Sequence, residues 1–147
     1  MRKSKVIVLS VISGLIVAIV AYFVIRCNFA YFYYDYDELI VKVEKVEIVD
    51  ASNPAKPVVL YTIPDEEKEE FLNDLSKIKF TYNLQIQKHD MLNVAVKLNF
   101  YDGKTITFDN NTTYSKIKKY QGGACNYHQY CRLVSKYYDG EISLKAY

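Results

Sequence analysis

An apolar run near the N-terminus constrains this chain more than any other feature of its sequence. Residues 6–25 read VIVLSVISGLIVAIVAYFVI and include no charged side chain in twenty positions. A helix rises about 1.5 Å per residue, so a helix of this length extends about 30 Å and matches the hydrocarbon core of a bilayer. We therefore predict one transmembrane helix, and a single-pass protein that contacts the lipid bilayer through it.

The two sides of the run carry different charges. Basic residues precede it and mainly acidic residues follow it: Arg2, Lys3 and Lys5 on the near side, and Arg26, Asp35, Asp37 and Glu38 on the far side. Segments rich in Lys and Arg stay in the cytoplasm. We therefore predict a signal-anchor in the cell membrane, with a cytoplasmic N-terminus and an extracytoplasmic C-terminal domain.

Aromatic side chains crowd the far end of the run, where amphipathic rings prefer the headgroup layer. We predict that the following residues lie at the membrane interface: Tyr22, Phe23, Phe29, Tyr31, Phe32, Tyr33 and Tyr34. The alternative is that some of these rings cap the domain that follows.

A cleaved signal peptide is the main alternative to an anchor. Its apolar core usually has about 7 to 15 residues and is followed by a small-x-small cleavage site, whereas this run is longer and no such site follows it. Lipid modification at Cys27 would require a small residue directly before it, and Arg26 stands there. Cys27 is then a free thiol, a link between two copies of the chain, or acylated in place.

The rest of the chain has the length and composition of one compact domain. We divide the chain into residues 1–36, which hold the basic tip, the transmembrane helix and the aromatic segment, and residues 37–147, an extracytoplasmic α+β domain. The net charge of the whole chain is +2, but four of its nineteen Lys and Arg residues flank the helix. The remaining fifteen, against seventeen Asp and Glu, give the domain a net charge of −2. This charge argues against nucleic acid as a partner. Fifteen tyrosines and no tryptophan are typical of an AT-rich bacterial genome.

The domain is predicted to contain a mostly antiparallel sheet. Residues 41–50 are rich in β-branched side chains whose alternation changes phase once, which indicates a strand with a bulge. Residues 58–63 follow as a hairpin partner, and residues 92–101 and 104–109 form a second hairpin that turns at Asp102 and Gly103. Further strands are predicted at 80–86, 114–120 and 141–147.

Two helices are predicted in the domain. The first opens at Pro64 and Asp65, and its apolar stripe consists of Phe71, Leu72, Leu75 and Ile78. The second follows Gly122 and Gly123, with Asn126 as its N-cap, and ends by Gly140. One face of it carries Tyr127, Tyr130, Cys131, Val134, Tyr137 and Tyr138. A stripe at helical spacing is more often a core face than a partner-binding face, and we interpret it as core.

Cys125, His128 and Cys131 are the one cluster of metal-binding or redox-active residue types, at successive intervals of three. A zinc site would need a fourth ligand, for which only His89 or Cys27 is at hand. A Cys125 nucleophile with His128 as base would need an orienting group and an oxyanion site that the sequence does not identify. A disulfide between Cys125 and Cys131 would require the first helical turn to unwind, because an intact helix separates them too far. The remaining interpretation is structural, with Cys131 a small buried residue and Cys125 a free thiol near the cap.

The class of function follows by comparing what each class requires. The sequence has no paired carboxylates in a motif context, no nucleophile with its partners and no glycine loop for phosphate, so we expect no enzyme, no cofactor and no resident metal. We expect a non-catalytic interaction or assembly module with an unknown protein partner. The alternative is a membrane-anchored immunity or inhibitor protein that binds one dedicated toxin or enzyme, and a thiol-dependent enzyme is the remote alternative.

Overall fold

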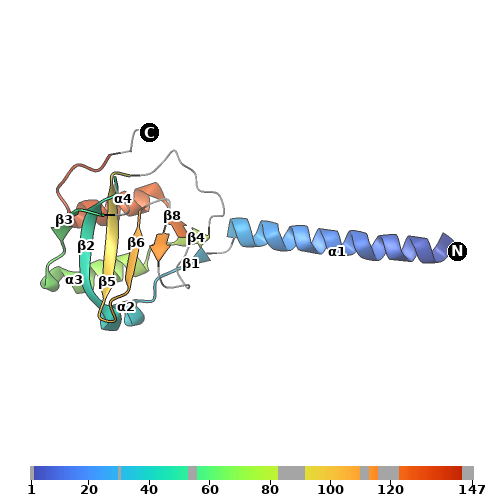
Figure 1. Ribbon diagram of the computed structural model, residues 1–147, viewed down its shortest axis with the longest axis horizontal. Helices are drawn as coiled ribbons and strands as arrows, with labels where there is room; N and C mark the ends of the chain where they lie inside the picture. The colour runs from blue at the N-terminus through green and yellow to red at the C-terminus, as the bar shows by residue number, and fades with distance from the viewer. Residues whose placement is uncertain are drawn as a thin grey trace. The chain divides into compact units, whose positions relative to one another are not determined.

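The computed structural model describes residues 2–29, 31–52, 56–82, 92–109, 113–115 and 123–143, with their side chains except at 2–6, 25–29, 82, 113–115 and 124. The chain divides into two compact units, Met1–Ala30 and Tyr31–Tyr147. The first unit is the helix α1 (Arg2–Phe29), and the second is an α+β domain with antiparallel sheets (Figure 1). The predicted α+β class is therefore confirmed.

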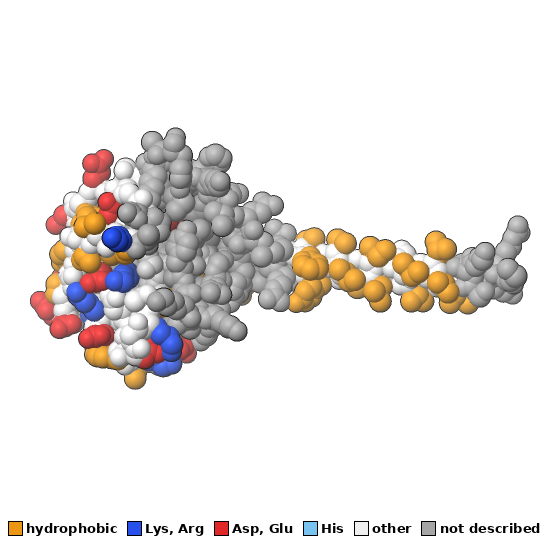
Figure 2. Space-filling model, in the orientation of Figure 1, with side chains coloured by type: hydrophobic (Ala, Val, Ile, Leu, Met, Phe, Trp, Pro, Cys, Tyr) orange, Lys and Arg blue, Asp and Glu red, His pale blue; other side chains and the backbone are white. Residues whose placement is uncertain are grey.

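Helix α1 is long and apolar enough to cross a membrane. Its window Ile7–Val24 has a mean hydropathy of 2.8, and no part of that window is buried inside the chain. Figure 2 shows hydrophobic side chains along the described length of α1 and no charged ones. A signal sequence near an N-terminus meets the same criteria, so length and composition establish a candidate span.

The larger sheet has five antiparallel strands in the order β3-β2-β5-β6-β7. Their bounds are β2 (Val43–Asp50), β3 (Val59–Thr62), β5 (Val94–Phe100), β6 (Thr105–Phe108) and β7 (Thr113–Ser115). The pairings of β2 with β3 and of β5 with β6 confirm both predicted hairpins. Gly103 has a φ of 77°, which its lack of a Cβ allows, and lies in the β5–β6 turn as predicted. The bulge predicted in the first strand corresponds to a register shift between Val43 and Lys45.

A second, three-stranded sheet joins segments that are far apart in the sequence. It consists of β1 (Tyr31–Phe32), β4 (Phe80–Tyr82) and β8 (Gly123–Cys125), in the order β1-β4-β8. The single predicted sheet is therefore two. Of the strands predicted at 80–86 and 114–120, the structure describes 80–82 and 114–115 as strand, and the other positions lie outside the described residues. Residues 141–143 are not a strand, although the Asn93 N–H donates to the Ser143 carbonyl at 2.9 Å, and 144–147 lie outside the described residues.

The described part of the domain contains three helices where two were predicted. Helix α3 (Asp65–Ser76) follows the prediction, with Phe71, Leu72 and Leu75 buried. Helix α4 (Tyr127–Tyr137) is capped by the Asn126 side chain, as predicted. The additional helix, α2 (Tyr36–Lys42), occupies the start of the predicted strand at 41–50 because Asp35 caps it by accepting bonds from the backbone N–H groups of Asp37 and Glu38.

Helices α3 and α4 lie on the same face of the five-stranded sheet (Figure 1). Side chains from the inner face of the strands are fully buried there, among them Val46, Ile48, Val96 and Leu98. From α4, Tyr130 enters this core with no exposed surface, and its hydroxyl donates to the Val94 carbonyl at 2.9 Å. Leu133 and Val134 pack there as well, whereas Tyr127 is exposed, so only part of the predicted tyrosine face is core.

The opposite face of the sheet carries a buried carboxylate. Glu47 is 6% exposed and is bonded by Lys45 at 2.6 Å, Lys97 at 3.2 Å and the Asn99 amide at 3.0 Å. Burial opposes ionisation of this carboxyl group, but the hydrogen bonds from Lys45, Asn99 and Lys97 outweigh it and lower the pKa of Glu47. The ionised carboxylate therefore ties β2 to β5.

The aromatic residues that were predicted to lie at the membrane interface are divided between surface and core. Tyr22, Phe23, Tyr31 and Tyr33 are exposed, and the side chain of Phe29 lies outside the described residues. Tyr34 is 2% exposed and Phe32 packs against the same core, so the alternative of rings that cap the domain applies to these two. The compact domain accordingly begins at Tyr31, before the predicted boundary at residues 36 and 37.

Replacing Tyr34 tests this boundary. In a soluble fragment of residues 31–147, Tyr34→Ala removes a ring that lies 4.9 Å from the Phe80 ring and 5.8 Å from the Phe108 ring. We expect the free energy of unfolding, measured by urea titration, to fall by about 3–5 kcal/mol. The matched control is Tyr33→Ala, whose ring is 48% exposed, and which should cost within about 0.5 kcal/mol. Equal losses for the two variants would contradict the placement of Tyr34.

Glu47→Gln tests the buried carboxylate. The variant should lower the free energy of unfolding at neutral pH by about 1–3 kcal/mol, because it keeps the shape but weakens three charge-assisted bonds. The folded-state pKa lies below its ordinary value of 4.5, so the contribution is present above pH 4.5 and is lost as the pH falls through the folded-state value. Urea titrations across this range should therefore show the two proteins converge in acid. Glu44→Gln, at an exposed position of the same strand, serves as the control and should change the free energy of unfolding at neutral pH by no more than about 0.5 kcal/mol.

Candidate functional site

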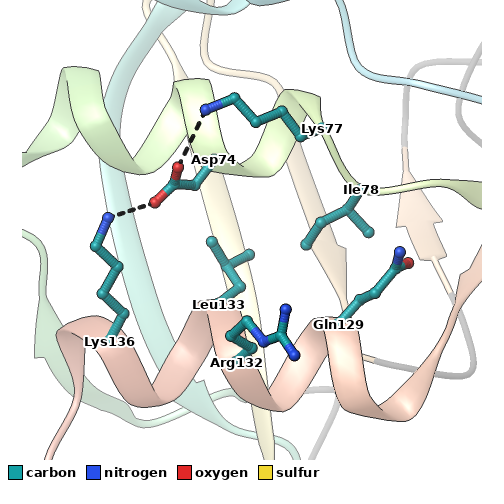
Figure 3. Close-up of a pocket in the computed structure, with 7 residues that line it drawn as sticks. All are labelled: Asp74, Lys77, Ile78, Gln129, Arg132, Leu133 and Lys136. Carbon is teal, nitrogen blue, oxygen red and sulfur yellow. Dashed lines mark hydrogen bonds and ion pairs between the residues drawn. The ribbon is translucent and has the colours of Figure 1, made fainter.

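A groove between α3 and α4 is the candidate site (Figure 3). It has a volume of about 390 Å³ and is lined by Asp74, Lys77, Ile78, Gln129, Arg132, Leu133 and Lys136. Ile78 and Leu133 are 6% and 4% exposed and form an apolar floor. The other lining side chains are polar or charged and form the rim. Ligand sites of proteins commonly combine a mostly apolar surface with a few polar groups that fix orientation.

The packing of the two helices places these side chains. The apolar stripe of α3 faces the sheet, so the next residues around the helix, Asp74 and Lys77, come to the edge that faces α4. On α4, the residues beside the buried Leu133 come to the edge that faces α3 (Figure 3). They are Gln129, Arg132 and Lys136. The Phe71 and Tyr137 rings meet between the helices with their centroids 5.1 Å apart. The groove is therefore a product of how both helices bury their apolar faces.

A bonded network around Asp74 holds one end of the groove. Its carboxylate accepts bonds from Lys136 at 2.6 Å and the Tyr137 hydroxyl at 3.0 Å, with Lys77 at 3.5 Å. Burial opposes ionisation, but these bonds outweigh it and lower the pKa of Asp74. Burial and the bond to Asp74 raise the pKa of Tyr137 to about 12, against the opposing effect of Lys136. Lys136 also bonds Glu70 at 2.6 Å, so this end is fixed by both helices.

The other part of the rim includes a cation, Arg132, that does not belong to the network around Asp74. In Figure 3 the side chains of Arg132 and Gln129 extend from α4 toward the space between the helices. No carboxylate in the described part of the chain lies within ion-pair distance of Arg132. A guanidinium binds a carboxylate through two parallel hydrogen bonds. The groove can therefore accept a carboxylate at Arg132 with an apolar group against Ile78 and Leu133.

The cluster of Cys125, His128 and Cys131 does not converge into a site. Cys125 ends β8, one residue before the N-cap of α4, while His128 is exposed in the first helical turn. No group of His, Cys, Asp or Glu that could hold a metal ion occurs among the described residues. The possible fourth ligands, His89 and the side chain of Cys27, lie outside them. The two described thiols, Cys125 and Cys131, are free, and Cys131, which was predicted to be buried, is only half-buried.

The surroundings of Cys125 favour the structural interpretation of this residue. Its side chain is 8% exposed, and its Sγ lies 3.9 Å from the Asp109 carbonyl, to which it donates. Burial, and then the nearby Asp109 carboxylate, raise the pKa of the Cys125 thiol. A nucleophilic cysteine needs the thiolate, which a lowered pKa supplies. At neutral pH Cys125 is therefore a protonated thiol.

Thiol labelling of the 31–147 fragment, which lacks Cys27, tests this assignment. A Cys131→Ser variant, with Cys125 as its one thiol, should react slowly with iodoacetamide at neutral pH and rapidly in concentrated urea, because burial and the raised pKa both suppress the thiolate. A Cys125→Ser variant, with only the half-buried Cys131, should react measurably without urea. Rapid labelling of native Cys125 would contradict its assignment and reopen the thiol-enzyme hypothesis.

Comparisons of this chain with protein-family models, with curated proteins and with solved structures found no match. The groove residues were also not found by sequence reasoning. Asp74 and Lys77 lie on the polar side of one predicted helix, and Arg132 and Lys136 on that of another, so each set had the pattern of a solvated face. Only the packing of α3 against α4 brings them together.

Proposed function

We propose that this protein is a single-pass membrane protein whose extracytoplasmic domain is a non-catalytic interaction or assembly module. The observation that carries the proposal is the α3–α4 groove, which combines an apolar floor with a predominantly cationic rim. We further propose that a partner protein binds there through a segment with a carboxylate beside an apolar side chain. The carboxylate would meet Arg132, and the apolar side chain would cover Ile78 and Leu133.

The composition of α1 supports the membrane anchor. Its exposed side chains include Ile7, Leu9, Leu15 and Val17, each more than 60% exposed. Removing such side chains from water is favourable by about 1.5–3 kcal/mol each, so a lipid environment stabilises this helix strongly. The uncharged run is longer than the core of most signal peptides, which favours a retained anchor. Arg2, Lys3 and Lys5 favour a cytoplasmic N-terminus.

Anchoring in a membrane would raise the apparent affinity of the groove for a partner in the same membrane. A shallow groove of about 390 Å³ provides little buried area, so binding to a freely diffusing partner would be weak. Two proteins held at the same membrane have a raised effective concentration, which increases apparent affinity without new contacts. The protonated Cys125 thiol is consistent with a role that does not need a nucleophile.

Photo-crosslinking of the full-length chain in its native membrane tests the proposal. A photoreactive residue at Gln129, in the groove, should yield one recurrent protein adduct in a membrane fraction that resists alkaline extraction. The same residue at Tyr101, exposed in the β5–β6 turn, should not. In the Gln129 background, Arg132→Glu should reduce the adduct several-fold through charge repulsion, while the matched Lys104→Glu should leave it unchanged. Equal adducts at both positions, or insensitivity to Arg132→Glu, would overturn the groove as the binding surface.

The alternative is a membrane-anchored immunity or inhibitor protein. Exposed acidic side chains along α3, namely Asp65, Glu66, Glu69 and Glu70, favour this candidate because they offer a surface to a basic partner. The identity of the crosslinked partner distinguishes the two roles. A toxin or a single enzyme would support the immunity role, and a component of an envelope complex would support the assembly role.

A further inference from the structure

Strand β3 forms one edge of the five-stranded sheet, and no described strand pairs with its outer side. The Ile63 N–H donates to the Val46 carbonyl at 3.0 Å, so Ile63 faces β2. Because backbone groups alternate along a strand, those of Thr62 face away from β2. An edge of this kind is a template for a further strand.

The side chains of this edge are apolar and exposed. Val58, Val59 and Leu60 are 61%, 45% and 42% exposed, and residues 58–63 include no charge. Figure 2 shows hydrophobic side chains on the side of the domain where Figure 1 places β3. Edge strands are usually protected by a short length, a proline, a bulge, a charged side chain or a covering element. Among the described residues, β3 has three of these features, namely its length of four residues, a register shift opposite Ile48 and Val49, and prolines at 57 and 64, and together they leave only a few residues for pairing.

The charges at the two ends of the edge are opposite in sign. Lys56 precedes the segment, and Asp65 and Glu66 follow it. The side chain of Asp65 is 93% exposed. When two identical strands pair antiparallel about a two-fold axis, the start of each lies beside the end of the other. Lys56 of each copy then lies near Asp65 and Glu66 of the other copy, so the favourable contact is made twice.

We propose that β3 pairs antiparallel with β3 of a second copy of this chain and joins the two five-stranded sheets into one. A strand from an unrelated protein could satisfy the same backbone groups, but its end charges would have to match by chance, whereas this chain supplies the matching charges itself. Prolines 57 and 64 limit the pairing to the residues between them. This inference is independent of the groove, which lies between the helices and not at the sheet edge.

The pairing is closed and suited to a membrane-held protein. A two-fold interface uses the edge of both copies, so it produces dimers and no larger assemblies. A few backbone bonds and three apolar side chains per copy form a small interface, which corresponds to a weak association in solution. Anchoring both copies in one membrane raises their effective concentration and favours the dimer.

Charge reversal in the full-length chain in membranes tests the proposal. A photoreactive residue at Leu60 should yield an adduct of dimer mass that contains two copies of this chain. Lys56→Glu and Asp65→Lys, each introduced alone, place like charges together at both ends and should reduce the dimer several-fold. The double variant Lys56→Glu with Asp65→Lys restores opposite charges and should recover most of the dimer. Recovery is specific to self-pairing, since an unrelated partner would face two altered charges.

A matched pair of lysine substitutions separates the edge from general surface effects. With the photoreactive residue moved to Val59, Leu60→Lys should abolish the dimer adduct, whereas Val41→Lys, at another exposed apolar position, should not. Unchanged thermal melting of the 31–147 fragment carrying either substitution shows that folding is intact. Adducts with another protein and none with itself, the absence of any adduct, or a double variant as weak as the single ones would each overturn the proposal. These outcomes leave the Gln129 crosslinks unaffected, so each proposal fails separately.

Discussion

The structure of the domain depends on how α3 and α4 bury the inner face of one sheet. Tyr130 is central to this packing, because its ring is fully buried and its hydroxyl donates to the Val94 carbonyl at the start of β5. A buried hydroxyl without a partner would cost about 1–3 kcal/mol, so the bond sets where α4 sits on the sheet. The same position brings Leu133 beside Ile78 and creates the floor of the groove. The groove is thus a consequence of core packing.

The two faces of the sheet are stabilised by different means. The inner face relies on apolar side chains beneath the helices, whereas the outer face holds Glu47 within bonds from Lys45, Lys97 and Asn99. Val49, Ala51 and Ala95 form a small separate apolar cluster. This arrangement explains why β2 lacks a simple alternation of apolar and charged residues. The bulge shifts the phase near the start of β2, and Val49, which packs with Ala51 and Ala95 on the outer face, interrupts the pattern after Ile48.

The sequence predicted the elements whose local signals agree with their tertiary environment. The stripe of α3 and the Asp102-Gly103 turn are of this kind, and both are found. Helix α2 was missed because Val41 and Val43 favour a strand, although Asp35 followed by Asp37 and Glu38 is a typical helix start. Tyr34 was predicted at the membrane interface because it lies close to α1 in the sequence. Its contacts with Phe80 and Phe108 depend on the folded domain and could not be read from that position. The groove required the approach of α3 and α4, which local patterns do not encode.

The three-stranded sheet determines when the domain can fold during synthesis. Its strands come from residues 31–32, 80–82 and 123–125, so the first strand has no partner until the middle strand has been made and the sheet is incomplete until the last. Contacts this far apart in sequence form slowly, because long loops must close first. Tyr34 therefore cannot be buried against Phe80 and Phe108 until both of these residues have been synthesised. A chain interrupted before α4 would lack Tyr130, Leu133 and Val134, so the part of the sheet that these side chains cover would stay exposed until α4 has been made.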